Sequence, residues 1–272
     1  MREMVSIIIP SYNREKEISR AINSILQQTY ENYEIIVVDD GSTDHTGSVV
    51  RNFKDERIRY IRLGQNQGAG HARNIGIQEA RYDYIAFLDS DDEWMPDKLN
   101  LQMTKLLSVE ENFGMVYCRM SGYQRHSDAR FICPPMELKS EVLEGELFEK
   151  LLLHNVIGTP TVLLRRECLE QVGRFKESLL CLEDWEWMLR IAKKWKIGFV
   201  DKILVEVHKL DGSISTNVGG YLVTRCYMVS LYRKEMTEVG ILERVRDDVL
   251  ERAKLFGLYE EMKELITRDF EL

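Results

Sequence analysis

Short apolar runs alternate with amphipathic segments over the first third of the chain, and this alternation constrains the fold more than any other feature of the sequence. The runs are rich in β-branched and aromatic residues, as buried strands are, and they occupy 5–10, 33–39, 58–63 and 84–88. Between them lie predicted helices at 14–28 and 43–53, and a glycine-rich loop at 64–74 that enters a third helix ending near Ala80. Strands and helices in this order form a parallel sheet with right-handed crossovers. The predicted fold class is therefore α/β, with a mostly parallel central sheet flanked by helices.

Four carboxylates follow the run at 84–88, namely Asp89, Asp91, Asp92 and Glu93. They fall where the predicted strand leaves the sheet, the edge at which open α/β sheets bind ligands. Two unit charges about 4 Å apart at an effective dielectric constant of about 20 repel by about 4 kcal/mol, so converging carboxylates need a cation. Because these ligands are hard oxygens, the expected cation is Mg²⁺ or Mn²⁺. The alternative is a solvated acidic turn in which Asp92 or Asp97 only caps the next helix.

A second acidic pair, Asp39 and Asp40, ends the run at 33–39 at the same predicted edge. A carboxylate there can accept a hydrogen bond from a nucleobase N–H or a ribose hydroxyl. Arg73 lies just inside a predicted helix N-terminus, where its guanidinium and the free backbone N–H groups could face an anion or a base carbonyl. The alternative for Arg73 is a surface arginine. The loop is not the dinucleotide fingerprint, because it lacks the third glycine.

Length and composition limit the classes of function that the chain can have. The 272 residues suit one large domain with an appendage. A net charge of -8 argues against a nucleic-acid partner, which would call for a basic face. The five cysteines form no C-x-x-C pair, so neither a disulfide framework nor a zinc site is expected. With no signal-peptide pattern and no run of about 18 apolar residues, the chain is expected to be cytoplasmic and to have no transmembrane segment.

Five motifs in order resemble the family 2 inverting glycosyltransferases, which have the glycosyltransferase-A fold and use nucleotide-diphosphate sugars. The motifs lie at 6–13, 38–42, 72–74, 87–92 and 181–187. The resemblance covers about residues 5–215. It implies a catalytic domain at 1–215, with a nucleotide-binding half at 1–95 and an acceptor-binding half at 96–215. The implied partners are a nucleotide-diphosphate sugar, with UDP as the expected nucleotide, and a glycan, cell-surface polysaccharide or lipid-linked acceptor.

The resemblance also implies roles for individual residues on the donor side. The residues expected to contact the nucleotide are Pro10, Tyr12, Asp39, Asp40, Arg73, Asp89 and Ser90. Tyr12 can stack on the nucleobase while Pro10 fixes the loop, although both could instead pack in the core. Asp91 is the expected metal ligand, Asp89 reaches the ribose or the metal, and Asp92 is a reserve. His208 is expected to complete the metal shell, with a structural histidine as the alternative.

On the acceptor side, the resemblance assigns the general base to Asp184. An inverting transferase needs one base to take the proton of the acceptor hydroxyl as it attacks the anomeric carbon. Glu183 is expected to hold the acceptor. Trp185 and Trp187 lie on different helix faces, so one is expected to pack in the core and the other, assigned as Trp185, to form a sugar platform. Alternatively, Glu183 and Asp184 are only first-turn acids favoured by the helix dipole.

The second half and the tail have less regular patterns. Helices are predicted at 97–109, 147–155, 167–172 and 183–195, with strands at 115–123 and 158–164 and an apolar run at 203–207. Residues 124–135 are expected to be a mobile loop, and 211–215 a loop that closes on the diphosphate. Residues 216–272 predict a helical appendage with helices at 221–235, 241–256 and 258–267. It is expected to dock on the catalytic domain, form a homodimer, or touch a membrane surface, the last being weakened by its mixed charges.

Two other functions stay open from the sequence. One is a non-catalytic nucleotide-sugar binding module, which would be favoured if Asp184 lay far from the metal acids. The other is a nucleotidyltransferase on a similar sheet, although residues 11–14 are not the glycine-rich basic loop that holds a triphosphate. The preferred function is a metal-dependent inverting glycosyltransferase.

Overall fold

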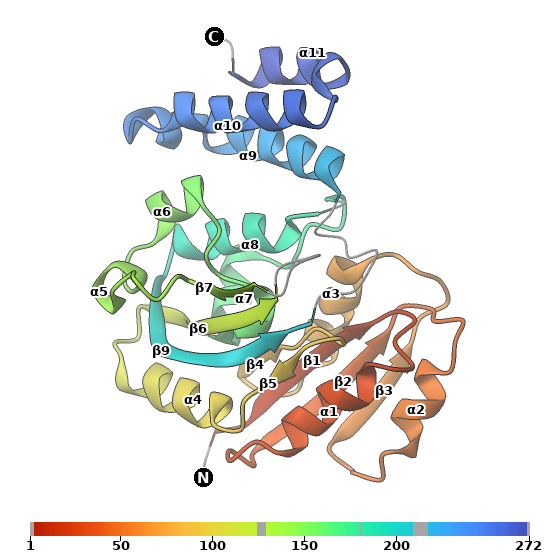
Figure 1. The fold of residues 1–272 in the computed structure, drawn as a ribbon. Coiled ribbons are helices and arrows are strands. Elements are labelled where there is room, and N and C mark those ends of the chain that lie inside the picture. The colour runs from red at the N-terminus through yellow and green to blue at the C-terminus, as the bar shows by residue number, and fades with distance from the viewer. Residues whose placement is uncertain (1–2, 124–128, 180, 209–216, 271–272) are drawn as a thin grey trace.

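The computed structural model describes residues 3–123, 129–179, 181–208 and 217–270 (Figure 1). Within these residues a nine-stranded sheet has the order β3-β2-β1-β4-β8-β6-β9-β5, and β7 pairs with β6. The strands are β1 (Val5–Ser11), β2 (Tyr33–Asp39), β3 (Ile58–Arg62), β4 (Tyr84–Phe87), β5 (Glu93–Trp94), β6 (Phe113–Tyr123), β7 (Arg130–Cys133), β8 (Leu163–Arg165) and β9 (Lys196–Val207).

Helices cover the sheet and then form a separate layer at the C-terminal end (Figure 1). They are α1 (Ile18–Leu26), α2 (Thr46–Asn52), α3 (Ala69–Glu79), α4 (Lys98–Ser108), α5 (Ser140–Leu143), α6 (Phe148–Leu153), the 3-10 turn η1 (Thr159–Thr161), α7 (Arg166–Val172), α8 (Glu183–Ala192), α9 (Val218–Glu238), α10 (Leu242–Leu255) and α11 (Tyr259–Phe270).

The first half matches the predicted parallel arrangement. Strands β3, β2, β1 and β4 are parallel neighbours, and every residue of β1 and β2 is buried because helices cover both faces. The first helix begins at Ile18 rather than at residue 14. The reason is that side chains of the neighbouring loop hold the preceding backbone: the amide of Arg14 donates to Thr46 Oγ1 at 2.7 Å and that of Glu15 to Asp44 Oδ2 at 3.0 Å.

The second half of the sheet is mixed. β8 lies antiparallel between β4 and β6, while β6 and β9 are parallel. β9 begins at Lys196, well before the apolar run expected at 203–207. The pairing with β6 shifts register beside Cys118 and Arg119, and this irregularity lets Asp201 and Lys202 face solvent within the strand. The loop expected at 124–135 is partly wrong, since β7 pairs with β6 along Met120–Tyr123. Residues 124–128 lie outside the described part.

The C-terminal helices dock on the α/β part of the chain, which was one of the expected arrangements. Buried residues of α9, α10 and α11, such as Met228, Val249 and Phe270, belong to the same hydrophobic cluster as Trp187 of α8 and Phe87 of β4. Figure 1 shows α9 lying across α8 and α6, with α10 and α11 stacked beyond it. The expected boundary at 215/216 and the loop at 211–215 lie outside the described residues. No helix among the described residues is both long and apolar enough to cross a membrane.

Candidate active site

The carboxyl ends of β1, β2 and β4 meet at one edge of the sheet, as their parallel pairing requires. Asp39 and Asp40 end β2 there, and both are buried. Asp39 accepts hydrogen bonds from the amide of Ser42 at 2.8 Å and from the hydroxyl of Tyr60. Asp40 accepts from the amides of Gln67, at 3.0 Å, and Gly68, at 2.7 Å. Both carboxylates therefore fix the loops around the edge, and only their remaining lone pairs could reach a nucleotide.

Tyr12 extends from this edge and is 40% exposed. Its ring is therefore not packed in the core, which was the alternative to stacking on a nucleobase. The amide of the next residue, Asn13, donates to Ser42 Oγ at 2.9 Å, which ties the Tyr12 loop to the turn after β2. Pro10 lies within β1, beyond Ile8, the last residue of β1 that pairs with β4. A proline therefore costs no bond to β4 at that position.

Arg73 occupies the centre of the site. It is 6% exposed, and its Nη2 lies 2.8 Å from Asp89 Oδ1 while its Nη1 lies 2.8 Å from Glu183 Oε1. The alternative of a surface arginine is therefore wrong. Both Nη atoms are already paired with carboxylates, so Arg73 would have to give up one of these ion pairs to contact a nucleotide directly. The close approach of α3 and α8 makes this contact short: a Cβ on Gly70 would lie 3.4 Å from Glu183 Cγ. Arg73 thus joins the acid after β4 to the first turn of α8.

The acids expected to bind metal lie beside this bridge. Asp91 Oδ2 is 3.8 Å from Arg14 Nη2, and Asp92 Oδ1 accepts from the amide of His208 at 3.0 Å. Burial and the charge of Asp89 raise the pKa of Asp91, and burial with both neighbouring aspartates raises the pKa of Asp92 well above its usual value. The carboxylates therefore repel one another, as the sequence predicted.

Oxygen donors of this kind fit Mg²⁺ or Mn²⁺, whose charge would offset the repulsion. Among the residues that the structure describes, however, no three acidic, histidine or cysteine side chains converge on one point. Such an ion would thus take several ligands from water or a diphosphate. The ring of His208 faces Glu93, with Nε2 3.3 Å from Oε1, rather than Asp89 or Asp91. The imidazole of His208 would therefore have to turn away from Glu93 to bind an ion held by Asp89 and Asp91.

Asp184 lies on the other side of Arg73, in the first turn of α8. Its Oδ1 accepts from the amide of Trp185 at 2.7 Å and its Oδ2 from Thr159 Oγ1 at 3.3 Å. Burial, reinforced by the charge of Glu183 and opposed by Arg73, raises the pKa of Asp184 to about 6. A carboxylate with this pKa is ionised near neutral pH and binds a proton more readily than an ordinary aspartate, which are the two requirements of a general base.

The sugar platform expected at Trp185 is wrong. Trp185 and Trp187 are both buried, and each indole N–H is satisfied inside the protein: Trp185 donates to the carbonyl of Leu151 at 2.7 Å, and Trp187 to that of Gly173 at 3.1 Å. The ring of Trp187 also packs against Phe175, with centroids 4.4 Å apart. Both tryptophans therefore anchor α8 in the core and position Asp184.

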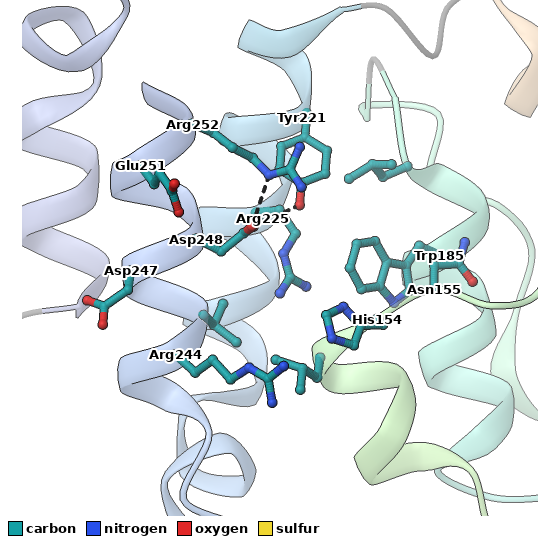
Figure 2. Close-up of a pocket in the computed structure, with 13 residues that line it drawn as sticks. His154, Asn155, Trp185, Tyr221, Arg225, Arg244, Asp247, Asp248, Glu251 and Arg252 are labelled. Carbon is teal, nitrogen blue, oxygen red and sulfur yellow. Dashed lines mark hydrogen bonds and ion pairs between the residues drawn. The ribbon is translucent and has the colours of Figure 1, made fainter. Parts of the chain in front are cut away.

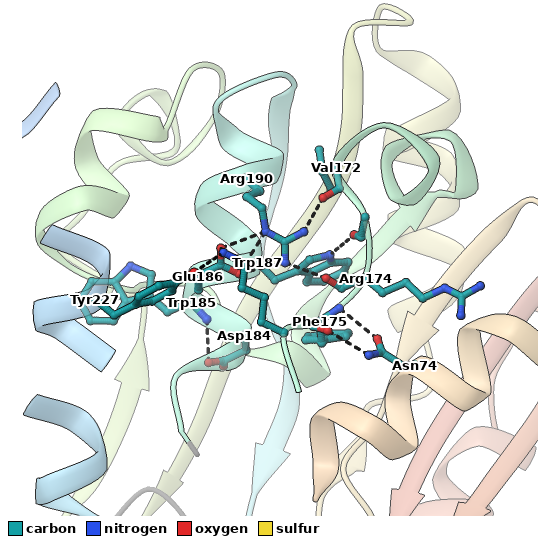
Figure 3. A network of polar contacts seen from close by, with 12 residues as sticks. Asn74, Val172, Arg174, Phe175, Asp184, Trp185, Glu186, Trp187, Arg190 and Tyr227 are labelled. Atoms are coloured by element: carbon teal, nitrogen blue, oxygen red, sulfur yellow. Dashed lines mark hydrogen bonds and ion pairs between the residues drawn. The ribbon is translucent and has the colours of Figure 1, made fainter. Parts of the chain in front are cut away.

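A polar network that the sequence did not reveal holds α8 from its second turn (Figure 3). Glu186 is fully buried and binds Lys176 Nζ and Arg190 Nη2, each at 2.9 Å. Arg190 also donates to the carbonyl of Arg174 at 2.7 Å. The four-residue spacing of Glu186 and Arg190 was the signal that could have indicated part of this network.

Asn74 provides the second link to α8. Its side chain exchanges two hydrogen bonds with the backbone of Phe175, at 2.9 and 3.0 Å (Figure 3). Helix α3, which carries Arg73, is thereby tied to the loop before α8. The sheet edge that carries Asp89 and the first turn of α8 are thus held in a fixed relative position.

Comparison with known proteins agrees with this architecture. A structure of S. aureus TarS in complex with UDP-GlcNAc superposes with a TM-score of 0.65 at 22% identity, over 83% of this chain and 66% of that chain. The mannosyltransferase PcManGT from Pyrobaculum calidifontis, in complex with GDP-Man and Mn²⁺, gives a TM-score of 0.65 at 20% identity, over 86% of this chain and 65% of that one. At such identity the likeness shows the fold alone, and it confirms the expected glycosyltransferase-A type.

Sequence relatives are closer. The Escherichia coli protein WfgD, described as a UDP-Glc:alpha-D-GlcNAc-diphosphoundecaprenol beta-1,3-glucosyltransferase, is 35% identical over 79% of this chain and 80% of its own length. TuaG of Bacillus subtilis, a putative teichuronic acid biosynthesis glycosyltransferase, is 31% identical over 79% of this chain and 83% of its own length. Other relatives are longer: the chain spans 42% and 41% of uncharacterized glycosyltransferases from Rickettsia conorii and Rickettsia felis. The family model for glycosyl transferase family 2 matches residues 6–173, and the chain belongs to that family.

Proposed function

We propose that this chain transfers a sugar from a UDP-sugar to a hydroxyl group of a glycan or lipid-linked acceptor, with inversion at the anomeric carbon. The observation that carries this proposal is the double ion pair of Arg73. One guanidinium binds Asp89 at the donor edge and Glu183 beside Asp184, each at 2.8 Å. A donor held at the sheet edge would therefore lie next to the carboxylate that can act as base.

Asp184 is the proposed base. Its carboxylate takes the proton of the acceptor hydroxyl while that oxygen forms a bond to the anomeric carbon. The bond from the anomeric carbon to the diphosphate oxygen breaks, and its electron pair leaves with UDP. The products are the inverted glycoside, UDP and protonated Asp184, which returns the proton to solvent. The pKa of about 6 suits this cycle because the group is ionised before the reaction at neutral pH.

The proposed metal ligands are Asp91 and Asp89, with His208 nearby. Their oxygens and the imidazole are donors that Mn²⁺ or Mg²⁺ accepts. When bound, the cation would supply charge neutralisation to the diphosphate leaving group. The raised pKa values of Asp91 and Asp92 support a role for a cation here, because a nearby positive charge would favour their ionised forms. The complex of PcManGT with Mn²⁺ is in line with this.

The proposed donor and acceptor classes follow from the relatives. WfgD is described as using UDP-Glc, and the TarS structure holds UDP-GlcNAc. The acceptor named for WfgD is a sugar on a lipid diphosphate, and TuaG is named for teichuronic acid biosynthesis. A UDP-sugar donor and an acceptor from cell-surface polysaccharide synthesis are therefore proposed for this chain.

The non-catalytic binding module is the main rival. A large distance between Asp184 and the acids after β4 would favour it. Arg73 instead pairs with both Asp89 and Glu183, the neighbour of Asp184, and this proximity argues against a binding module. A nucleotidyltransferase is disfavoured by the family membership.

A thermal-shift screen of nucleotide sugars with Mn²⁺ tests the donor that is proposed. A donor at about 100 times its Kd stabilises the fold by about 2.7 kcal/mol, so a UDP-sugar should raise Tm, and no response to any UDP-sugar would contradict the proposal.

A further inference from the structure

A cavity of about 580 Å³ lies between the C-terminal helices and the first turn of α8 (Figure 2). Leu182 and Trp185 line it from α8 and the residue before it, and His154 lines it from the end of α6. Arg225 of α9 and Arg244 of α10 face it from the other side. The donor edge and the Arg73 bridge take no part in this cavity.

Arg225 forms the base of the cavity and is unusually poorly satisfied. It is 1% exposed, and its Nη atoms reach only the carbonyl of Leu152, at 3.3 and 3.4 Å, and the sulfur of Met228, at 3.8 Å. Its Nε has no partner among the described residues. The guanidinium also stacks over the ring of Trp185, 4.2 Å from the centroid. A buried guanidinium without a carboxylate is costly, so an anion in this cavity would be strongly favoured.

The acids of the cavity do not neutralise Arg225 directly. Asp248 is already held by Arg252, at 3.0 Å, and by the hydroxyl of Tyr221, at 3.1 Å. Asp247 points away from His154 and Trp185 and lies 3.3 Å from Arg246 (Figure 2). Glu251 is exposed at the rim. The buried part of the cavity therefore keeps the positive charge of Arg225.

Arg244 adds a second cation. It is exposed, lines the cavity, and has no ion pair within the described part of the chain. Figure 2 shows its guanidinium on the same side of α10 as His154. Burial lowers the pKa of His154, and the charges of Arg244 and Arg225 lower it further, which marks a positive environment around the ring. Arg225 from the base and Arg244 from the rim can thus approach one ligand together.

We propose that this cavity binds a phosphate group carried by the acceptor. Leu182 and Trp185, which line the cavity, flank Glu183 and Asp184 in the chain, so the cavity lies beside the first turn of α8, and an acceptor whose hydroxyl reaches Asp184 can place a neighbouring phosphate in it. A phosphate presents oxygens in several directions, which lets it meet two guanidinium groups at once. The assignment of the phosphate to the acceptor rests on the transferase function proposed above. The binding of phosphate itself does not.

The test uses the whole chain and inorganic pyrophosphate as the probe. Pyrophosphate is titrated by calorimetry in the presence of EDTA, so that metal-assisted binding at the donor edge is suppressed. Arg244→Ala removes the rim cation, and because Arg244 is exposed the variant is expected to fold. Lys254→Ala is the matched control, since Lys254 is an exposed cation on the same helix and does not line the cavity.

Arg244→Ala should weaken pyrophosphate binding by about tenfold, as loss of one charge-assisted hydrogen bond does, and Lys254→Ala should leave it within about twofold. Equal affinities in the parent and both variants, or no measurable binding to the parent, would overturn the proposal. UDP binding with Mn²⁺, measured in the same variants, should be unchanged. That second titration tests the donor site separately, so failure of the cavity and failure of the transferase function are distinguishable.

The source of the phosphate is resolved by a second probe. Farnesyl diphosphate carries the same charged group on a short lipid, and farnesol is the lipid without it. Tighter binding of farnesyl diphosphate than of pyrophosphate, sensitive to Arg244→Ala, assigns the cavity to a lipid-linked acceptor. Equal binding of the two assigns it to a soluble phosphate-bearing glycan. Binding of farnesol as tight as that of farnesyl diphosphate would show that the phosphate is not recognised.

Discussion

Arg73 Nη1 lies 2.8 Å from Glu183 Oε1, a contact between residues 110 positions apart that ties the N-terminal turn of α3 to the N-terminal turn of α8. The other Nη atom of the same guanidinium lies 2.8 Å from Asp89. A planar guanidinium can serve two carboxylates at once, which an ammonium group on a flexible stem cannot do with the same geometry. The sheet edge that carries Asp89 and the first turn of α8 therefore share one positive charge.

Arg73→Lys should destabilise the fold by about 1 to 3 kcal/mol, because lysine keeps the positive charge but cannot pair with both carboxylates at once, so one of them loses its partner. Urea unfolding of both proteins measures the difference. Lys234→Gln is a suitable control, since its ion pair with Glu238 is 3.8 Å long and exposed, and it should change stability very little. A loss below about 1 kcal/mol for Arg73→Lys would mean that the bridge is not a structural requirement.

The rate of sugar transfer should depend on the protonation of Asp184. Because its pKa is raised to about 6, the fraction of enzyme with an ionised base increases through this pH and then levels off. At saturating donor, the transfer rate should therefore rise about tenfold per pH unit below the pKa and reach a plateau about one unit above it. A rate that is flat from about pH 5 upward would disagree with a base of this pKa.

Asp184→Asn should be more stable than the parent at neutral pH. The folded-state pKa of Asp184, about 6, lies above its ordinary value of 3.8, so the folded state binds its proton more tightly than the unfolded state. The stability that this provides is fully present below the unfolded pKa and is lost as the pH rises through about 6. At neutral pH the parent carries a penalty of about 2 to 3 kcal/mol that asparagine lacks.

This gain is measured by urea unfolding of both proteins at acid and at neutral pH. The difference between Asp184→Asn and the parent should grow in favour of the variant as the pH rises from about 4 to about 7. Acids that do not interact with Asp184 contribute alike to both proteins and cancel in the difference. A difference that does not change with pH would show that Asp184 has an ordinary pKa in the folded protein.

UDP should bind tightly only when Mn²⁺ or Mg²⁺ is present, and Asp91→Asn should remove this dependence. The ion would offset the repulsion between the diphosphate and the acids after β4, and asparagine withdraws one ligand charge. Calorimetric titrations with metal and with chelator provide the comparison. Asp97→Asn is the matched control: Asp97 follows the same acidic segment but bonds to Thr29 Oγ1 at 3.0 Å. Equal affinity of the parent with chelator and with metal would refute the metal role.

The sequence predicted the N-terminal part of the fold well because its signals are local. The apolar runs of β1 and β2 are buried on both faces, and Asp39, Asp40 and Asp89 lie at the ends of strands where the chain order put them. The length of β9 was missed because Asp201 and Lys202 interrupt the apolar pattern at an irregularity of the ladder.

The interior of the site could not be predicted in the same way. Whether Arg73 faces solvent or two carboxylates depends on how closely α3 approaches α8, which is decided by packing at Gly70 and Phe175. Likewise, Trp185 fits either a sugar platform or a core position on an amphipathic helix, and the carbonyl of Leu151 that accepts its N–H comes from a separate helix. Contacts between distant segments carry no periodic signal in one sequence.

The transfer rate and donor affinity of Asp184→Asn test whether Asp184 is the base of a sugar transfer. Asparagine keeps the size and most hydrogen bonds of the side chain but cannot accept the proton. We expect unchanged affinity for the UDP-sugar and a transfer rate lower by about 10²- to 10⁴-fold, or about 3 to 5 kcal/mol of transition-state stabilisation. Transfer within about threefold of the parent, at unchanged donor affinity, would contradict the claim and assign the base to another residue.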